Sequence, residues 1–161
     1  QGRMEFGARA LGNRSILANP LNPNMKKIIN SKIKFREKFR PFAPSILENH
    51  LNEYFVTNKI SKIPFMNIVL NIKTQYKKTI PAVVHNDNTC RVQTVNINEN
   101  YRYFKLIESF YKKTGFPILL NTSFNVNEPI CESPKDALEC FLKTDMDMVV
   151  INDFVLIKNT K

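Results

Sequence analysis

Basic side chains are concentrated in the first forty residues of this 161-residue chain. This quarter carries ten Lys or Arg residues against two Glu residues, a net charge of +8, while the whole sequence carries +10. Five of the seven arginines fall here, and the planar guanidinium of Arg can bind two phosphate oxygens at once. We therefore expect this part of the chain to bind an anion. The alternative is a solvated lysine-rich surface, which fits the lysines after residue 58 better than it fits this cluster.

A period of two runs from residue 32 to residue 40. The cations are Lys32, Lys34, Arg36, Lys38 and Arg40, and the residues between them are Ile33, Phe35, Glu37 and Phe39. In a β-strand the five cations would share one face, and the other face would lie on a core. The pattern predicts a strand over 32–40 and makes Lys34 and Arg36 candidate phosphate ligands. The competing interpretation is an edge strand whose lysines prevent aggregation.

A second candidate site follows an apolar run. Residues 118–125 read Ile-Leu-Leu-Asn-Thr-Ser-Phe-Asn, so the run ends in small hydroxyl and amide side chains. Ligands of open α/β sheets gather where strands end, and such groups can bond a phosphate or carbonyl oxygen without adding charge. The structural alternative is a polar turn that caps its own backbone. The candidate ligands of this segment are Asn121, Thr122, Ser123 and Asn125.

The opening of the chain interleaves glycines with arginines. The glycines are Gly2, Gly7 and Gly12, and the arginines are Arg3, Arg9 and Arg14. Glycine allows a backbone to approach a ligand closely while arginine binds the ligand's charge. Neither the dinucleotide-binding G-x-G-x-x-G nor the P-loop motif is present, so the glycine spacing alone is weak support for a site.

Cysteine and histidine are too few for a metal framework. The three cysteines form no C-x-x-C pair, which excludes a set of disulfides, and we expect reduced, partly buried thiols. With two histidines and no H-x-x-x-H spacing, we expect no zinc site in this chain. A metal ion would then arrive with a nucleotide.

The elements that must position these residues alternate along the chain. Helical periodicity and capping signals predict helices over 22–29, 48–54 and 100–114, and from Ser133-Pro134 onward. Apolar, β-branched runs predict strands over 65–72, 80–84, 91–95, 116–120, and a hairpin of 148–151 with 154–157. The class is mixed α/β with an antiparallel final hairpin.

Composition limits the alternatives further. Apolar residues make up 43% of the chain, and no run is long enough to span a membrane, so we expect a soluble, cytoplasmic domain. The length suits one domain with its own core. Because the first residue is Gln1, we also expect the chain to be a piece of a longer protein.

Three segments together resemble the C-terminal domain of the carbamoyltransferases of nodulation-factor, cephamycin and tobramycin biosynthesis. They are residues 1–15, Lys34-Phe35-Arg36 with Arg-Pro-Phe-Ala-Pro-Ser at 40–45, and Asn-Thr-Ser-Phe-Asn at 121–125. Residues 85–95 and Glu128-Pro129-Ile130 follow in the family's order. The chain departs from the family at Ala8, where Pro is usual, at 88–91, where Gly-Thr-Ala-Arg is usual, and before Glu128, where Gly is frequent.

The resemblance implies a YrdC/Sua5-like fold, an open twisted mixed or antiparallel sheet with helices. Residues 34–36 match the K-x-R signature of that fold, and residues 123–125 match its S-x-N signature. Residues 1–161 would be the C-terminal domain of an enzyme whose larger N-terminal, Kae1-like domain is absent from this chain. That N-terminal domain would be the partner of this one and would hold an iron-type metal.

The activity that the resemblance implies is formation of carbamoyl-adenylate from carbamoyl phosphate and ATP with Mg²⁺. The N-terminal domain would then transfer the carbamoyl group to a hydroxyl acceptor. Displacement at phosphorus needs positioned positive charge more than covalent help. The residues expected at the reacting phosphates are Lys34, Arg36, Arg91, Ser123 and Asn125, and those expected to bind substrate or nucleotide are Arg9, Arg14, Ser15, Arg40, Asn121 and Thr122.

Two other functions remain open at the level of sequence. A basic quarter with interleaved aromatics also suits an RNA-binding YrdC-like module, whose binding would fall steeply with salt. A purely structural domain would bind neither RNA nor nucleotide. We favour ATP and carbamoyl phosphate as the ligands and expect no membrane or nucleic acid partner.

Overall fold

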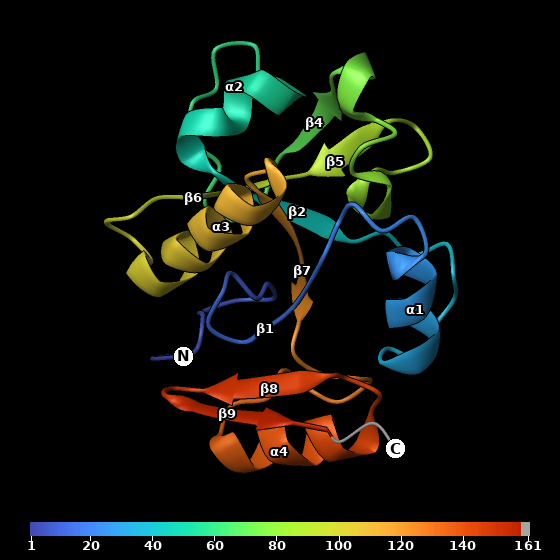
Figure 1. The fold of residues 1–161 in the computed structure, drawn as a ribbon, viewed down its shortest axis with the longest axis vertical. Helices are drawn as coiled ribbons and strands as arrows, with labels where there is room; N and C mark the ends of the chain where they lie inside the picture. The colour runs from blue at the N-terminus through green and yellow to red at the C-terminus, as the bar shows by residue number, and fades with distance from the viewer. Residues whose placement is uncertain (159–161) are drawn as a thin grey trace.

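A four-stranded sheet runs through the middle of the molecule (Figure 1). The structure is a computed structural model that describes residues 1–158. The strand order is β1 (Ser15–Ala18), β7 (Ile118–Ser123), β2 (Ala43–Leu47) and β6 (Gln93–Val95). β7 pairs antiparallel with both β1 and β2, and β6 pairs parallel with β2. The sheet is therefore mixed and open.

Two smaller sheets flank this one at opposite ends of the view (Figure 1). An antiparallel sheet of three strands has the order β3 (Phe55–Val56), β4 (Val69–Ile72) and β5 (Thr89–Arg91). The final hairpin consists of β8 (Met148–Ile151) and β9 (Phe154–Ile157). The mixed α/β class and the antiparallel hairpin expected from the sequence are both confirmed.

In the described part of the chain, four α-helices pack around the sheets. They are α1 (Met25–Lys32), α2 (Leu51–Tyr54), α3 (Tyr101–Thr114) and α4 (Pro134–Lys143). Short 3-10 turns cover Glu48–His50, Thr74–Tyr76 and Pro81–Val83. Among the described residues, no helix is long and apolar enough to cross a membrane.

Capping residues explain where the two longest helices begin and end. At α3, the Asn100 side chain accepts a hydrogen bond from the Tyr103 N–H, and Gly115 ends the helix with φ of +79°. At α4, the Ser133 hydroxyl accepts from the Asp136 N–H while the Asp136 carboxylate accepts from the Ser133 N–H. Gly115 and Ser133 are two of the signals from which these helices were expected.

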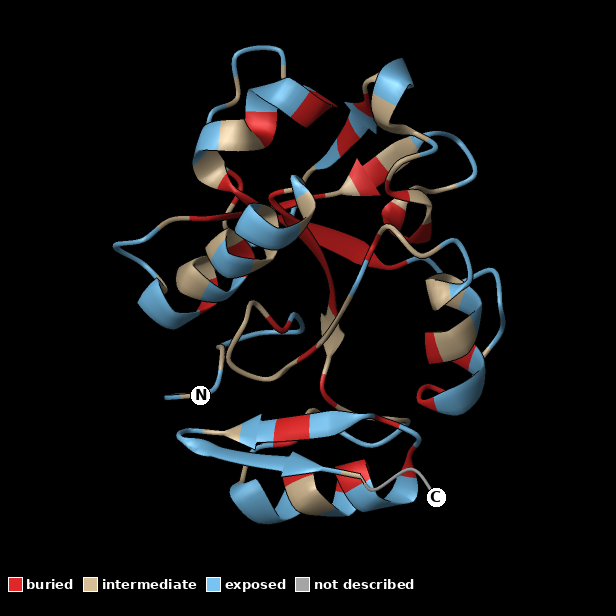
Figure 2. Cartoon of the chain, in the orientation of Figure 1, coloured by how far each residue is buried: buried red, intermediate tan, exposed pale blue. Residues whose placement is uncertain are grey.

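β2 is buried along its whole length, and β7 is buried from Ile118 to Asn121, as the red colouring shows (Figure 2). Successive strand residues face opposite sides. Ile46 and Leu120 accordingly join the larger core, and Leu47 and Leu119 join a smaller core beneath α3 that contains Ile107. Burial on both faces holds the polar end of β7 at a fixed place.

The strand expected over 32–40 is wrong. α1 continues to Lys32, and the chain then turns back on it, since the Lys34 N–H bonds to the Ile29 carbonyl at 2.8 Å. Phe35 adopts a φ of +46°, which breaks any strand alternation. As a result Lys34 is 2% exposed, whereas Phe35 and Phe39 are 57% and 71% exposed, the reverse of the expected pattern.

Several other boundaries differ from expectation. Residues 80–84 form a 3-10 turn rather than a strand, because Pro81 has no N–H for a ladder. The run 91–95 divides at Val92 into β5 and β6, which belong to different sheets. The helix expected over 22–29 begins at Met25 instead. Strands β1 and β2 were not expected from the sequence at all.

Candidate functional site

The Lys34 ammonium joins two segments that lie far apart in the sequence. Its Nζ donates to the backbone carbonyls of Ser123 and Asn125, each at 2.6 Å, and to Asn125 Oδ1 at 2.8 Å. These acceptors lie where β7 ends, close to the turn that follows α1. The structure therefore brings the K-x-R and S-x-N segments into direct contact.

Burial makes the charge on Lys34 costly. Removal from water, followed by repulsion from Arg36, lowers the pKa of Lys34 from 10.5 to about 8. The three oxygen acceptors favour the ammonium form, so the side chain still carries its charge at neutral pH. Lys34 is thus a cation held inside the domain against the end of β7.

The side-chain amide of the buried residue Asn30 holds the Arg36 guanidinium in place. Arg36 Nε donates to Asn30 Oδ1 at 2.8 Å, and the guanidinium lies 4.9 Å from the centre of the Phe42 ring. Asn30 is fully buried, and its Nδ2 donates to the Arg40 carbonyl at 3.2 Å. Burial lowers the pKa of Arg36, with repulsion from Arg40 second. Within residues 1–158 the Arg36 side chain makes no other hydrogen bond, so its terminal nitrogens are available to a ligand.

Arg40 and Thr122 lie at the margin of this arrangement. The Arg40 Nε contacts a Glu37 carboxylate oxygen at 2.8 Å, and both side chains are exposed. Thr122 is half-buried and lies opposite Ile16 in the β1–β7 register. Within residues 1–158, neither Arg40 nor Thr122 forms a side-chain hydrogen bond with Lys34 or Arg36.

The S-x-N turn is closed by its own polar groups. The Ser123 hydroxyl donates to Asn125 Oδ1 at 2.7 Å, and Asn125 Nδ2 donates to the Glu128 carbonyl at 2.6 Å. The Glu128 carboxylate accepts from the N–H groups of Val126 and Asn127, each at 3.1 Å. Ser15 stands opposite Ser123 in the β1–β7 register. These bonds make the turn a fixed set of hydroxyl and amide groups.

A second group of basic side chains lies in and near β5. Burial lowers the pKa of Arg91, and repulsion from the exposed Arg9 contributes next. Arg91 Nε is buried and has no hydrogen-bond partner among the described residues. His85, whose pKa burial also lowers, is close enough to Arg91 and Lys26 to be affected by both charges. A buried donor without a partner is unusual and suits a site that binds an acceptor.

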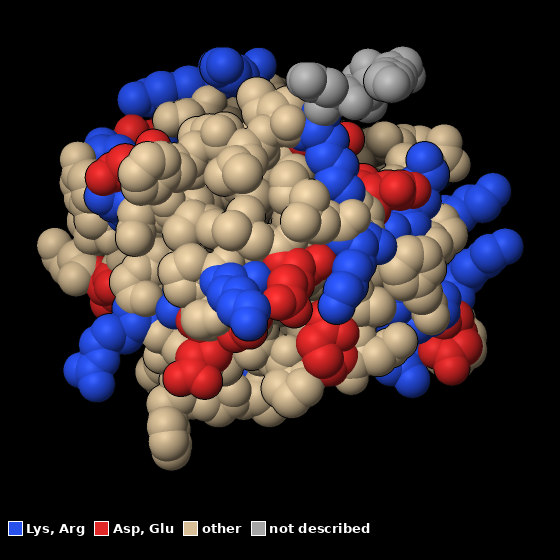
Figure 3. Space-filling model, turned by 90° about the horizontal axis from the view of Figure 1, so that it is seen from below, with Lys and Arg blue, Asp and Glu red and all other residues tan. Residues whose placement is uncertain are grey.

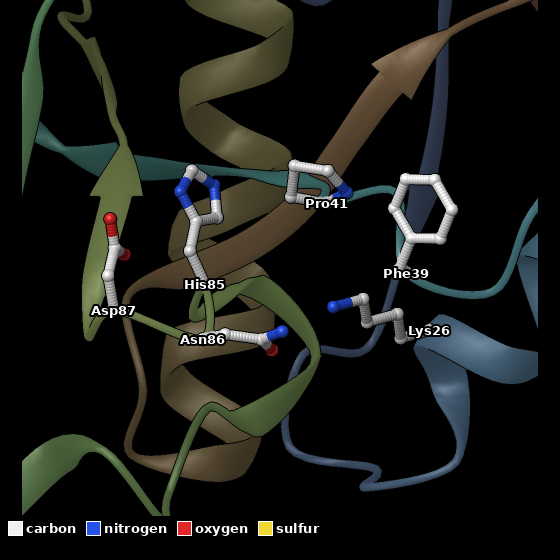
Figure 4. A pocket seen from close by; sticks show the side chains of 6 residues that line it. All are labelled: Lys26, Phe39, Pro41, His85, Asn86 and Asp87. Atoms are coloured by element: carbon white, nitrogen blue, oxygen red, sulfur yellow. The ribbon is translucent and has the colours of Figure 1, made fainter.

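A pocket of about 270 Å³ opens beside His85 (Figure 4). Its lining comes from α1, from the loop before β2 and from the loop before β5. The residues are Lys26, Phe39, Pro41, His85, Asn86 and Asp87. Figure 4 shows Lys26 reaching toward Asn86 from the α1 side. The pocket combines a cation with amide, imidazole and carboxylate groups.

Asn121 belongs to a buried network. Its Nδ2 donates to Ser45 Oγ at 3.1 Å and to Gln93 Oε1 at 3.0 Å, and it reaches the Ala10 carbonyl at 3.1 Å. Gln93 Nε2 in turn donates to the Leu11 carbonyl at 2.8 Å. Asn121 is 1% exposed, and it lies between the sheet and residues 1–13, which precede β1 and which we call the N-terminal arm.

Arg14 and Ser15 also hold the N-terminal arm. The Arg14 guanidinium donates to the carbonyls of four residues, at 3.0 to 3.2 Å, namely Gln1, Gly2, Asn13 and Glu132. The Ser15 hydroxyl accepts from the Gly12 N–H at 2.9 Å. These contacts occupy the groups that the sequence suggested for a ligand.

Asn30 and Glu5 also support the site region, and neither is among the site residues predicted from the sequence. Glu5 Oε1 accepts from the N–H groups of Leu11 and Asn13, each at 2.7 Å, and so fixes the fold of the arm. The only sequence signal for Asn30 was an amide near the end of a helix that precedes basic residues. That signal is too common to indicate a site.

Glu128, Cys131 and Cys140 form a small group of potential metal ligands within residues 1–158. Their ligand atoms all lie within 4.8 Å of one another. Burial raises the pKa of Cys131, and it raises the pKa of Cys140 to about 12. Zinc binds the thiolate, so burial opposes metal binding here. The Glu128 carboxylate is also already held by two backbone N–H groups.

Comparison with known proteins decides the family. The family model described as "Carbamoyltransferase C-terminus" matches residues 1–158. The chain belongs to the carbamoyltransferase C-terminal family. This carbamoyltransferase domain is 49% identical to nodulation protein NolNO of Sinorhizobium fredii over 99% of its length, and 48% identical to nodulation protein NolO of Bradyrhizobium diazoefficiens over 98%.

The carbamoyltransferase domain spans only part of these relatives. The match covers 24% of NolNO and 29% of NolO. Nodulation protein U of Sinorhizobium fredii is 42% identical over 77% of this chain, and the match covers 22% of that protein. Most of each relative therefore lies outside the part that corresponds to residues 1–161.

Proposed function

We propose that this carbamoyltransferase domain forms carbamoyl-adenylate from carbamoyl phosphate and ATP. The observation that carries the proposal is the contact between Lys34 and the two residues of the S-x-N turn, Ser123 and Asn125. This contact brings together a buried cation, the adjoining Arg36 guanidinium, and fixed hydroxyl and amide groups. Such an arrangement suits the phosphates of a nucleotide.

The proposed reaction has two steps. First, water breaks the bond between the carbonyl-bound oxygen and phosphorus in carbamoyl phosphate, which releases carbamate and inorganic phosphate. Second, a carbamate oxygen attacks the α-phosphorus of ATP, and the bond from that phosphorus to the β-phosphate oxygen breaks. The products are carbamoyl-adenylate and pyrophosphate. Neither step needs a covalent enzyme intermediate.

The roles of the protein groups follow from their placement. The Arg36 guanidinium, held at Nε by Asn30, can offer its terminal nitrogens to two phosphate oxygens. Arg91, whose buried Nε lacks a partner among residues 1–158, is the second candidate for phosphate charge. Lys34 sets the shape of the turn and contributes charge from behind it. Asn125 Nδ2 has a second N–H besides the one bonded to the Glu128 carbonyl, and it would donate this one to a phosphate or to the carbamoyl group. The Ser123 hydroxyl would turn from Asn125 Oδ1 to donate to the same ligand.

Mg²⁺ would enter this site bound to the phosphates of the nucleotide rather than to protein carboxylates. The carboxylate next to the turn, Glu128, already accepts two backbone N–H groups, whereas the groups around Lys34 and Arg36 are anion ligands. The domain would bind the phosphates, and their oxygens would hold the ion, which adds positive charge at the reacting phosphorus.

Transfer of the carbamoyl group to a hydroxyl acceptor is assigned to the preceding part of the longer polypeptide. The relatives leave room for such a part, since the match covers about a quarter of NolNO. An iron-type metal, if the enzyme uses one, is expected there.

Calorimetry tests the ligand assignment. We expect residues 1–161 to bind ATP with Mg²⁺, and carbamoyl phosphate to bind as well. In the same titration, Arg36→Lys should weaken ATP binding. Arg102→Lys is its matched control, because Arg102 is an exposed arginine on α3. Absence of binding heat with either ligand, or with both together, would count against an adenylation site in this chain. Binding that falls steeply with salt and ignores ATP would favour RNA instead.

A further inference from the structure

The final hairpin is apolar on both of its faces. β8 reads Met-Val-Val-Ile and β9 reads Phe-Val-Leu-Ile. An antiparallel sheet with one face in water normally alternates apolar and polar side chains. A hairpin without this alternation indicates that both faces are covered in the functional protein.

The register divides the eight side chains into two sets. Directly opposed residues share a face, and the pairs are Met148 with Ile157, Val149 with Leu156, Val150 with Val155, and Ile151 with Phe154. On the inner face, Val149 of β8 is buried in the main core beside α4, whereas Leu156 and Phe154 of β9 are 40% and 74% exposed. The opposite face consists of the two other pairs, and we call it the outer hairpin face. Its members are Met148, Val150, Val155 and Ile157.

The outer hairpin face is open in this structure. Its four side chains are between 47% and 66% exposed, and none of them is polar. Figure 3 shows the end of the molecule that carries α4 and the hairpin, where basic and acidic residues cover only part of the surface. Clustered apolar side chains of this kind mark an interaction surface.

The chain begins beside the turn of the same hairpin (Figure 1). Gln1 Nε2 donates to the Asn152 carbonyl at 3.3 Å. Arg102 bridges the two, since it donates to Gln1 Oε1 at 2.8 Å and to Asp153 Oδ1 at 3.2 Å. Any polypeptide joined ahead of Gln1 would therefore start next to the hairpin.

We propose that the outer hairpin face is the docking surface for the polypeptide that precedes Gln1 in the longer protein. This inference rests on the proposed division of the enzyme into two parts. The matched family is described as a C-terminus, and about three quarters of a relative such as NolNO lies outside the match. We infer from the two together that a large part of the longer protein precedes the match. The partner surface is apolar, because four apolar side chains must lose their water to it.

The size of the face favours a covalently linked partner over a second copy. Four side chains are few compared with the roughly 1,200 to 2,000 Å² that a stable interface between separate proteins buries. A linked partner is held at an effective concentration of about millimolar, so a small patch is enough.

Hydrogen exchange tests this proposal. In the longer polypeptide with its natural sequence ahead of Gln1, Val150→Thr with Val155→Thr should speed exchange of the β9 amides at least tenfold. Threonine keeps the shape and strand preference of valine but adds a hydroxyl that must lose its water. The matched control is Val56→Thr with Val69→Thr, two half-exposed valines of the β3–β4 pair, which should leave β9 unchanged.

Two results would overturn the proposal. One is equal β9 exchange in the unchanged longer polypeptide and in the Val150, Val155 variant. The other is β9 protection in residues 1–161 alone that rises with protein concentration together with a dimer mass, since a second copy would then cover the face. Neither readout depends on ATP, so failure of nucleotide binding leaves this test intact.

Discussion

At the scale of single residues, the site depends on a lysine that is placed inside the domain rather than on its surface. Lys34 is almost fully buried, and its ammonium is held by two carbonyl oxygens and one amide oxygen. The neighbouring Arg36 is half-buried and is held by one bond to Asn30. The first cation thus organises the turn, and the second is the one that we propose binds the ligand.

Lys34 should make stability depend on pH. Its pKa is about 8 in the folded chain and near 10.5 when unfolded, so the unfolded chain binds more protons between these values. The free energy of unfolding should therefore rise with pH in this window. Relative to Lys34→Met, the wild type should gain about 2 kcal/mol between pH 8 and pH 10. Denaturant unfolding of both proteins at several pH values measures this difference, and parallel curves would contradict it.

Arg36→Lys should separate binding from folding. The variant keeps the charge but loses the planar fork, and charge-assisted hydrogen bonds contribute about 1.5 to 3 kcal/mol each. We expect ATP affinity to fall at least tenfold, and the free energy of unfolding to fall by only about 1 kcal/mol as the bond to Asn30 weakens. Titration calorimetry and urea unfolding report the two quantities. An unchanged affinity would remove Arg36 from the site.

At the scale of elements, the N-terminal arm is locked against the central sheet. Asn121, Gln93 and Arg14 bind carbonyl groups of the arm, and Glu5 binds two of its N–H groups. The arm therefore supports the end of β7, where the candidate site lies.

Gly12 should be essential to this lock. A Cβ there would lie 2.4 Å from the Tyr103 ring, and φ is +125°. Gly7 has a similar φ of +129° but open space around it. Gly12→Ala should therefore destabilise the domain by about 2 kcal/mol more than Gly7→Ala, because only the former overlaps a buried ring. Equal melting temperatures for the two variants would contradict the packing described here.

The sequence predicted well the elements that depend on neighbouring residues, and it predicted poorly those that depend on contacts between distant segments. The helices over 100–114 and from Ser133 onward are confirmed because their caps are formed by neighbouring residues. The strand over 32–40 is wrong because the backbone folds back onto α1, which the alternation of side chains does not reveal. β2 was missed because Pro44 lies inside it.

The sequence identified which residues form the candidate site better than it predicted how their side chains are oriented. The sequence singled out Lys34, Ser123 and Asn125 as ligands, and the structure places them in contact. The sequence did not predict that Lys34 points inward. Asn121 and Arg14 were expected at a ligand, whereas the structure has them binding backbone groups of the arm. Only the tertiary fold determines which polar group faces solvent.

At the scale of the whole molecule, the domain is proposed to carry the first half of a longer enzyme's reaction. Transfer to an unactivated alcohol needs a group that polarises the carbamoyl carbonyl and a group that takes the hydroxyl proton. The proposed site consists of anion ligands and supplies neither. We expect residues 1–161 to carbamoylate no sugar or aminoglycoside hydroxyl, as mass spectrometry of the acceptor would show. If carbamoylation were robust, the transfer site would lie within this chain, and His85 would be the first residue to change.

The most direct test of the central proposal is exchange of labelled pyrophosphate into ATP by residues 1–161. Reversible formation of carbamoyl-adenylate predicts exchange that requires both Mg²⁺ and carbamoyl phosphate. Asn125→Ala, which removes an amide of the S-x-N turn, should lower the exchange rate at least tenfold, while Arg102→Lys should not change it. No exchange in the fully supplied reaction, with ATP shown to be bound, would contradict carbamoyl-adenylate formation by this domain.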